Sequence, residues 1–459
     1  MTPKDAADTI VAISTPLGEA GIGIVRLSGP AAETIAAALF RPRRPKSRLL
    51  SHHLYLGQII APSGETVDEV LLTIMRGPQT YTREDVVEIH CHSGWSVLRR
   101  ILELCLAQGA RAARPGEFTL RAFLSGRIDL TQAEAVLEVI QARTEAGLKV
   151  AASHLEGRLG RGLQETREAL IDLLARVDAA LDFPEETNDL QAPVLAASLA
   201  LPLKALETLA ATYQEGRLLR EGLQVVIAGQ PNVGKSSLLN SLLARDRAIV
   251  TEIPGTTRDT IEEVITLGGV AVCLSDTAGL RPAQDRVEEL GIARTRERLA
   301  QADLVLYVLD GSLPLTPAAR RDLADLVGKP GLAVINKVDL PQELPVLDLE
   351  EATSLPVTKI SALTGQGVED LKKQIVDLAL QGGLNATGEM VTQARHYRHL
   401  HRCLTCLHQA RNLLKETAAP WELVALELQE AIRELGEITG QEVGDEVLDR
   451  IFGEFCLGK

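Results

Sequence analysis

Aromatic side chains are scarce in this chain, at 3% of 459 residues. Its hydrophobic cores must therefore consist mainly of Leu, Ala, Val and Ile, a composition that favours helices and buried parallel strands over sandwiches and barrels. Cysteine is scarce too. Six cysteines scattered over this length do not form a disulfide framework, so we expect the protein to reside in the reducing cytoplasm.

Long apolar runs are also missing. No stretch of about 18 uncharged apolar residues occurs, so we expect no membrane-spanning helix and no membrane partner. Met1–Asp5 carries an acid early and precedes no apolar stretch with a small-residue cleavage site, which argues against a signal peptide. The net charge of −14 argues against a protein that coats nucleic acid by bulk attraction. Local basic patches remain open at Arg41–Arg48 and Arg395–Arg402, where a solvated surface is the simpler interpretation.

The length predicts two to four domains. Residues 1–118 indicate a mixed α/β domain, because short β-branched runs alternate with glycine and proline. Residues 119–220 have the Leu- and Ala-rich, proline-poor pattern of long helices, interrupted at Asp182–Glu186. The predicted strands of the first part are Thr9–Ser14, Gly23–Leu27, Val70–Met75 and Val86–His90.

The helical part begins with a recognisable pattern. Thr131-Gln-Ala-Glu134 predicts a capping box, in which the hydroxyl and the carboxylate satisfy backbone N–H groups at a helix start. An apolar stripe facing the core is then predicted from helical spacing. It comprises Ala133, Val136, Leu137 and Ile140, and the same period recurs later in Leu428, Ala431, Ile432 and Leu435.

Residues 221–380 alternate strand-like and helix-like segments, which is typical of a parallel sheet with helices wound on both faces. Residues 381–459 are helical again. Since the termini of a compact α/β domain often lie close together, such a domain can be inserted into another. We therefore interpret 119–220 and 381–459 as two parts of one split helical domain with an α/β domain inserted. The predicted fold class is multidomain, α/β plus all-α.

The inserted segment contains a phosphate-binding loop. The sequence Gly229-Gln-Pro-Asn-Val-Gly-Lys-Ser236 fits G-x-x-x-x-G-K-[ST] and lies between a strand, Gln224–Ala228, and a helix. Backbone N–H groups of such a loop point at the β-phosphate, and the helix N-terminus adds positive potential. We expect Lys235 to bridge the β- and γ-phosphates and the Ser236 hydroxyl to bind Mg²⁺. Alone, the loop indicates a nucleoside triphosphate.

Four further motifs in order indicate guanine. Gly255-Thr-Thr257 supplies Thr257 to the Mg²⁺ shell, and Asp276-Thr-Ala-Gly279 supplies an aspartate that holds Mg²⁺ through water. In Asn336-Lys-Val-Asp339, the last carboxylate accepts from the ring N–H and the exocyclic amine of guanine, a pair that adenine lacks. Ser361-Ala-Leu363 closes over the base. The predicted GTP contacts are Asn232, Val233, Gly234, Lys235, Ser236, Ser237, Thr251, Glu252, Ile253, Pro254, Gly255, Thr256, Thr257, Asp276, Thr277, Ala278, Gly279, Asn336, Lys337, Asp339, Ser361, Ala362 and Leu363.

The hydrolytic chemistry departs from that of Ras-type proteins. There a glutamine next to D-x-x-G orients the attacking water, whereas this chain has Leu280, which neither donates nor accepts a hydrogen bond. The catalytic polar group must come from elsewhere. Glu288, an arginine of a partner and a bound cation are the three options.

Several long motifs outside the GTP site resemble the MnmE (TrmE) family. They are Asp8–Ala12, Gly21–Gly29, Arg114–Ala135, Asp182–Glu186 and the C-terminal Phe455-Cys-Leu-Gly-Lys459. The resemblance implies a GTPase that modifies C5 of the wobble uridine (position 34) of certain tRNAs to an aminomethyl or carboxymethylaminomethyl form. It also implies a homodimer that works with an FAD- and NADH-dependent partner, MnmG, which together would form a heterotetramer.

The resemblance further implies a folate site in the N-terminal domain, which would also form the homodimer. The one-carbon unit would come from a tetrahydrofolate derivative, in the 5,10-methylene or 5-formyl form. By motif position, its contacts would be Arg26, Glu88, Arg127 and Lys459, a sensible set because pterin needs hydrogen-bonding acids and a glutamate tail needs cations. His92-Ser93-Gly94 departs from the family's usual His-Gly-Gly near this pocket.

The family also uses K⁺ between paired GTPase domains in place of an arginine finger. Asn232 matches its side-chain ligand, and the backbone oxygens of Thr251, Ile253 and Thr256 match the others. A cation there would offset charge that develops in the transition state. Glu288 matches the glutamate that orients water, and Cys456 matches the C-terminal cysteine suspected of acting on uridine. We assign catalytic roles to Glu288, Lys235 and Cys456.

One alternative is a ribosome-assembly GTPase, a binding switch without modification chemistry. Such proteins share the asparagine of the phosphate-binding loop and also lack the glutamine. They usually append an RNA-binding module, whereas this chain has the folate-like N-terminal part and the Phe455–Lys459 tail. Folate binding would discriminate between the two.

Overall fold

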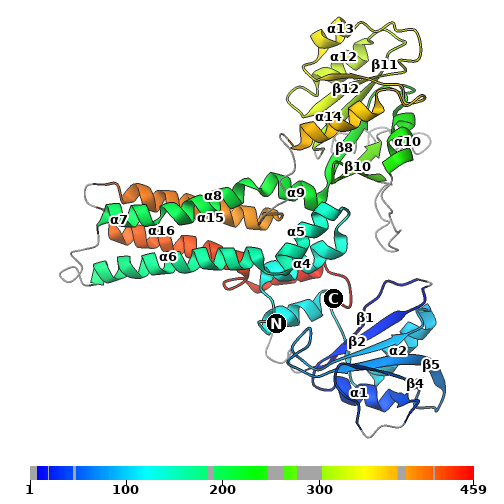
Figure 1. Ribbon diagram of the computed structural model, residues 1–459, viewed down its shortest axis with the longest axis vertical. Coiled ribbons are helices and arrows are strands. Elements are labelled where there is room, and N and C mark those ends of the chain that lie inside the picture. Colours follow the sequence, from blue (N-terminus) through cyan, green and yellow to red (C-terminus); the bar gives the residue numbers. More distant parts are fainter. Residues whose placement is uncertain are drawn as a thin grey trace, which may run out of the picture.

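The computed structural model describes residues 8–18, 20–44, 48–182, 191–246, 263–276, 302–380, 389–416 and 419–459. Three bodies follow one another in Figure 1: a sheet with two helices on it, a bundle of long helices, and a second sheet between helices. The helical bundle lies between the two sheet domains. This arrangement confirms the predicted multidomain fold class, with α/β and all-α parts.

The first sheet has seven strands in the order β3-β4-β5-β6-β2-β1-β7. All pairs are antiparallel except β1 with β7. The four predicted strands are present. The elements are β1 (Ile10–Ile13), β2 (Gly23–Ser28), α1 (Ala32–Leu39), β3 (Phe40–Pro42), β4 (His53–Ile60), β5 (Thr66–Met75), β6 (Val86–Cys91), α2 (Trp95–Ala107) and β7 (Arg111–Ala112).

Alternation along the strands puts one face of this sheet against α1 and α2. Leu27 and Leu72 are fully buried there and pack in one cluster with Ile35 and Leu98 of the helices. Leu54, which points to the opposite face of β4, is 58% exposed. The period of two along each strand accounts for this difference.

The helical domain is built from both sides of the insertion. Long helix α6 packs against α16, and α15 packs against α16 and α8. Leu163, Leu407 and Leu428 share one core cluster, which confirms the predicted split domain. Its helices are α3 (Glu117–Leu124), α4 (Leu130–Gln141), α5 (Glu145–Leu155), α6 (Arg158–Asp182), α7 (Ala192–Ser198), α8 (Ala200–Ala211), α9 (Tyr213–Glu221), α15 (Ala394–Leu413), α16 (Trp421–Thr439) and α17 (Asp445–Gly453).

The predicted capping box at Thr131–Glu134 is wrong. Asp129 caps α4: its carboxylate accepts the Gln132 backbone N–H at 2.9 Å, and the Gln132 side chain accepts the Asp129 N–H at 3.1 Å. The true box therefore begins two residues earlier. Glu134 lies inside the protein instead, where it accepts from the Arg395 guanidinium at 3.0 and 3.1 Å.

The apolar stripe predicted for α4 is also wrong in part. Ala133 is fully buried, but Ile140 is 43% exposed. The buried face of α4 includes two carboxylates, Glu134 and Glu138. A pattern of apolar residues cannot reveal a face that buries ion pairs. The later stripe, from Leu428 to Leu435, is confirmed on α16.

The second sheet has six strands in the order β13-β12-β11-β8-β10-β9, parallel except for β9 with β10. Two core clusters, one on each face, make it doubly wound as predicted. Its elements are β8 (Leu223–Ala228), α10 (Lys235–Asp246), β9 (Glu263–Leu267), β10 (Val270–Asp276), β11 (Leu304–Asp310), α12 (Pro317–Ala324), β12 (Gly331–Asn336), α13 (Val346–Ala352), β13 (Val357–Lys359) and α14 (Val368–Leu380).

One helical stretch, Ala192–Glu221, is long and apolar enough by composition alone to cross a bilayer. The stretch consists of α7, α8 and α9, and it contains six charged residues. Leu195, Leu203 and Leu206 are buried in the core that α15 and α16 share. Its apolar side chains thus pack the helical domain.

Candidate active site

The phosphate-binding loop connects β8 to α10. Gly229, Asn232 and Gly234 all have positive φ, at 141°, 65° and 96°. A side chain at Gly234 would overlap the amide of Asn336, so the loop and the Asn336 motif approach as closely as glycine allows. Sequence and geometry agree on a tight backbone turn at the start of a helix.

Lys235 crosses this loop from the first position of α10. Its ammonium donates to the carbonyls of Gly229 at 2.9 Å and Gln230 at 2.8 Å. The side chain is nearly buried, while Ser236 follows it in the same helical turn. Val233 is buried and anchors the loop in the core. The cation therefore lies where a phosphate chain wrapped by the loop would meet it.

Parallel pairing brings the other predicted motifs to the same edge of the sheet. Asp276 pairs in register with Ile227 of β8, and Asp310 pairs with Asn336. Asp276 ends β10 next to the strand that leads into Ser236. A serine hydroxyl and a carboxylate are hard oxygen donors of the kind that Mg²⁺ prefers, so these residues fit the ion.

The Asn336 motif holds the phosphate-binding loop from its other side. The Asn336 amide donates to the Val233 carbonyl at 2.9 Å, and its oxygen accepts the Ala362 N–H at 3.0 Å. Lys337, with φ of 64°, donates to the Asn232 carbonyl at 3.0 Å. The two residues thus link three of the predicted GTP-binding segments.

Asp339 lies against the last motif. Its Oδ1 accepts from the Ser361 hydroxyl at 2.6 Å, and that same hydroxyl oxygen accepts the Thr364 N–H at 3.1 Å. Ser361 is fully buried, whereas Leu363 is 86% exposed. The carboxylate is therefore held by a rigid neighbour beside an exposed apolar side chain, an arrangement that suits a flat base with two adjacent donors.

Two contacts of this site were not predicted. Asp310 pairs with the Lys337 ammonium at 2.5 Å. Burial alone would raise the pKa of Asp310, but Lys337 and Ser312 hold it below its usual value. Its place at the end of a parallel strand was the available signal, since ligand-binding residues gather at such ends.

The second unpredicted contact links the phosphate-binding loop to α12. Asp322 on α12 accepts from Gln230 at 2.6 Å and from the Tyr307 hydroxyl at 2.8 Å. Gln230 occupies a variable position of the loop motif, so no sequence signal connects it to Asp322. The remaining predicted residues, Thr251, Glu252, Ile253, Pro254, Gly255, Thr256, Thr257, Thr277, Ala278, Gly279, Leu280 and Glu288, lie outside the described residues.

A second cluster of predicted residues lies on the first sheet. Arg26 of β2 lies directly opposite Glu88 of β6, and its Nε donates to the Glu88 carboxylate at 2.9 Å. Its Nη1 donates to the carbonyl of Gly458 at 3.2 Å, so the C-terminal tail joins the pair. The Lys459 carbonyl accepts the Phe118 N–H at 3.2 Å. Burial and the nearby Arg26 lower the pKa of Lys459.

Arg127 lies near this cluster, against the ring of Tyr81. Its guanidinium carbon lies 4.9 Å from the centre of the Tyr81 ring, and the Tyr81 hydroxyl bonds to Thr119 at 3.0 Å. Burial raises the pKa of Tyr81, while the charges of Arg127 and Arg26 oppose that rise. Both arginines are thus near one aromatic ring. Cys456 is exposed on the same tail.

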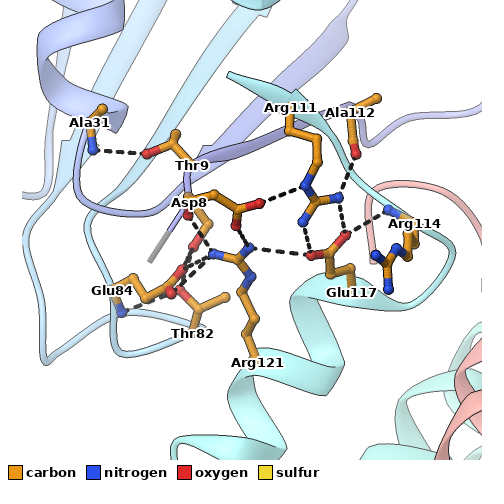
Figure 2. Close-up of polar contacts among 11 residues, drawn as sticks. Asp8, Thr9, Ala31, Thr82, Glu84, Arg111, Ala112, Arg114, Glu117 and Arg121 are labelled. Atoms are coloured by element: carbon orange, nitrogen blue, oxygen red, sulfur yellow. Dashed lines mark hydrogen bonds and ion pairs between the residues drawn. The ribbon is translucent and has the colours of Figure 1, made fainter. Parts of the chain in front are cut away.

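Helix α3 contacts the C-terminal tail through Phe118 and is held by a charged network (Figure 2). Arg121 is 4% exposed and pairs with Asp8 at 2.5 Å, with Glu84 at 3.1 Å and with Glu117 at 3.2 Å. Arg111 of β7 pairs with the other side of Asp8 and Glu117. Three carboxylates and two guanidiniums thereby join the sheet to the helix that carries Phe118.

Comparison with known proteins accounts for most of the chain. Residues 9–127 match the family model "GTP-binding protein TrmE N-terminus", and residues 130–456 match "MnmE helical domain". The tRNA modification GTPase MnmE of Chloroflexus aurantiacus is 49% identical over 454 residues, covering 98% of this chain and 100% of that protein. The MnmE of Symbiobacterium thermophilum is 47% identical, covering 98% of this chain and 99% of that protein.

Among solved structures, the G domain of the T. maritima FeoB iron transporter is 29% identical. The match covers 34% of this chain and 98% of that one, with a TM-score of 0.27. The family models and the near full-length relatives, together with the GTP site described above, identify the chain as a GTP hydrolase. It belongs to the MnmE family of tRNA modification GTPases.

Proposed function

We propose that this GTPase, with an FAD- and NADH-dependent MnmG-type partner, modifies C5 of the wobble uridine of certain tRNAs. The product is an aminomethyl or carboxymethylaminomethyl form, and a tetrahydrofolate derivative supplies the one-carbon unit. In this proposal residues 1–118 bind folate and dimerise, 119–220 and 381–459 form the helical domain, and 221–380 hydrolyse GTP. Homodimer and partner assemble as a heterotetramer in the cytoplasm, a location that six free cysteines suit.

The cluster of Arg26, Glu88, Arg127 and Lys459 on the first sheet supports the folate proposal. Arg26 and Glu88 come together on adjacent strands, and Lys459 reaches them from the other end of the chain. Glu88 offers a carboxylate to the N–H groups of a pterin ring. Lys459 and Arg127 offer cations to carboxylates of a glutamate tail. A folate derivative would supply the one-carbon unit, while the residues of this chain would bind and orient it.

The test is direct binding of 5-formyltetrahydrofolate to the full-length protein by isothermal titration calorimetry. Glu88→Gln removes the acceptor for the pterin donors, so we expect its Kd to rise by about 10-fold or more. Glu69→Gln, an exposed position on β5 of the same sheet, is the matched control and should bind as the wild type does. Absence of binding by the wild-type protein would favour the ribosome-assembly alternative.

For hydrolysis, we propose that K⁺ binds between paired GTPase domains at Asn232 and the backbone oxygens of Thr251, Ile253 and Thr256. Glu288 orients the attacking water, Lys235 neutralises the phosphates, and Ser236 and Thr257 bind Mg²⁺. The left-handed backbone of Asn232 and the link from its carbonyl to Lys337 support a fixed position for this residue. A fixed side-chain oxygen near the phosphates suits a weakly bound monovalent ion.

The cation proposal predicts a difference between two salts. GTP turnover should be fast in KCl and slow in NaCl at equal ionic strength, because a smaller ion fits the same oxygen ligands less well. Asn232→Ala should reduce the rate in KCl toward the rate in NaCl, with nucleotide affinity retained. Equal rates of the wild type in the two salts would contradict the proposal.

Cys456 is proposed to act on uridine as a nucleophile. Its exposure and its place on the tail beside Lys459 support access to a substrate base. Cys456→Ser should lose wobble-uridine modification, measured by mass spectrometry of tRNA nucleosides, and keep folate binding. Full modification by this variant would exclude the role.

A further inference from the structure

The GTPase domain is connected to the helical domain at two places, and one buried residue contacts both connections. The chain enters the domain through α9 and a single residue, Gly222, before β8. It returns through the segment from Met390 to Gln393, which leads into α15. Glu138 of α4 lies between these two connections and is 8% exposed.

The Glu138 carboxylate is fully engaged by this junction. Its Oε1 accepts from the Thr392 hydroxyl at 2.8 Å and from the Gln393 amide at 3.0 Å, both on the return segment. The Arg220 guanidinium, in the last turn of α9, lies 3.6 Å from the same oxygen. Its Oε2 bonds to Nδ1 of His154 on α5 at 3.1 Å.

His154 extends the contact to the return segment. Its Nε2 lies 2.8 Å from the Met390 carbonyl. Both ring nitrogens therefore face oxygen acceptors, an arrangement that the doubly protonated ring satisfies. Burial alone would lower the pKa of His154, but Glu138 raises it above its usual value. The junction thus holds a buried ion pair. Removing either member would leave the other charged group buried without its partner.

The packing around this ion pair is continuous with the core of the GTPase domain. Val150, Leu219 and Met390 belong to the same buried cluster as Leu223 and Val270 of the second sheet. The Thr212 hydroxyl accepts the Val391 N–H at 2.9 Å, so the outgoing and returning connections are also bonded directly to each other. Buried side chains of both domains therefore pack in one cluster at this point.

The junction also touches the strands that carry the GTP site. Arg143, between α4 and α5, lies 3.2 Å from the sulfur of Cys273 on β10. β8 and β10 begin at the junction, and at their other ends they lead to the phosphate-binding loop and to Asp276. The segment between α4 and α5 thus contacts β10, one of the two strands that lead to the GTP site.

We propose that Glu138 and His154 form a charged joint that fixes the orientation of the GTPase domain on the helical domain and couples GTP hydrolysis to tRNA modification. Glu138 acts here as a positioning residue, because its partners His154, Arg220, Thr392 and Gln393 are not among the predicted GTP contacts. The coupling half of the proposal rests on the proposed function, whereas the orientation half does not.

The orientation is measured by double electron–electron resonance. Spin labels are placed at Arg176 on α6 and Arg320 on α12, both exposed, after the exposed Cys456 and the partly exposed Cys406 are replaced by serine. Labelled chains are diluted with unlabelled protein so that one chain is observed. Glu138→Gln should broaden the distance distribution and reduce its main peak. An unchanged distribution would overturn the proposal.

Two further variants separate orientation from general stability. Glu134→Gln breaks an equally buried pair one turn earlier on α4, whose partners Arg395 and His396 both lie on α15. This control should leave the distances unchanged. Thr392→Val removes one donor from the return segment with little change in volume and should broaden them. If Glu134→Gln and Thr392→Val broadened the distance distribution equally, the Glu138 contacts would not be what fixes the orientation.

Activity then tests the coupling. Glu138→Gln should keep GTP turnover near that of the wild type and lose most tRNA modification. Retained modification together with broadened distances would overturn the coupling. If the wild type itself failed to modify tRNA, the proposed function would fail, and the distance measurements would still decide the orientation.

Discussion

At the residue scale, the side chains that we propose to bind guanine are held in place by their neighbours. Ser361, buried and bonded to the Thr364 N–H, fixes one oxygen of Asp339. Asn336 connects the phosphate-binding loop to the backbone of Ala362. A carboxylate fixed in this way loses little entropy on binding, so its preference for a base with two donors is strong.

Asp339→Asn should therefore change the base preference of the site from guanine to xanthine. An amide offers a donor where guanine also presents donors, so we expect the affinity for GTP to fall about 100-fold. Xanthine carries a carbonyl in place of the amine of guanine, and the amide N–H₂ can donate to it. Fluorescent GTP and XTP analogues would measure both constants. Asp325→Asn, an exposed position after α12, is the control and should leave both unchanged.

A residue of this site can be predicted from the sequence when the motif that marks it is short and continuous. Asp339 and Asn336 lie in one tetrapeptide at a strand end, and the spacing alone predicts their place. The partner of Lys337 is Asp310, at the end of another strand, and their pairing needs the strand order. Glu138 is harder still, because its partners come from three distant segments and share no motif.

At the element scale, α3 shows how buried charge can position a helix of only eight residues. Its Glu117 and Arg121 are 2% and 4% exposed and reach the network of Figure 2. Breaking a buried pair leaves a charge without its partner, which costs more than the pair contributes over apolar side chains. The helix therefore depends on every member of the network.

Glu117→Gln should loosen α3 by about 3 kcal/mol, the lower end of the cost of breaking a buried pair, since Asp8 and Glu84 still face Arg121. Hydrogen exchange of the peptide that covers α3 would measure the loss at neutral pH. Glu103→Gln, which breaks an exposed pair on α2, is the control and should cost less than about 1 kcal/mol.

The same network predicts a dependence on acid. Burial would raise the pKa values of Glu117 and Asp8, but the arginines hold both below their usual 4.5 and 3.8. A carboxylate whose pKa is lower in the folded state stabilises fully above its unfolded pKa and less as pH falls through the folded one. Protection of α3 should thus be constant above about pH 5 and decline below it. Decline already near pH 7 would contradict this origin.

Sequence predicts elements well where their apolar period is undisturbed. The stripe of α16 and the strands around the GTP site lie where the pattern puts them. The start and the buried face of α4 were mispredicted because Asp129, Glu134 and Glu138 all serve contacts there that an apolar period does not include. β4 was not predicted, although Tyr55 and Ile59 are buried and alternate with exposed residues.

At the scale of the whole molecule, the C-terminal tail reaches the charged cluster on the first sheet. Phe455 is buried beside Leu130 and Phe452, and it anchors the tail that follows. The Phe118 N–H donates to the Lys459 carbonyl, and Arg26 donates to that of Gly458. The tail after Phe455 thus lies against β2 and α3, beside the residues that we propose to bind folate.

Deleting Cys456–Lys459 should therefore abolish folate binding and leave GTP affinity unchanged, because the GTP site lies on the other sheet. Phe455 stays, so the cluster around it keeps its packing. Calorimetry with 5-formyltetrahydrofolate and with GDP would measure the two sites in one sample. Loss of both affinities would mean that the tail acts on folding and not on folate binding.

A single substitution tests whether folate binding requires the backbone path of the tail, since it leaves the length of the tail unchanged. Gly458 has φ of 88°, and a side chain there would lie 2.5 Å from the carbonyl of Ile13. Gly458→Ala should thus displace Lys459 and weaken folate binding nearly as much as the deletion does. Gly453→Ala, at the end of α17 with open space around it, should bind as the wild type. Equal folate binding by the wild type, Gly458→Ala and Gly453→Ala would show that binding does not require this backbone path of the tail.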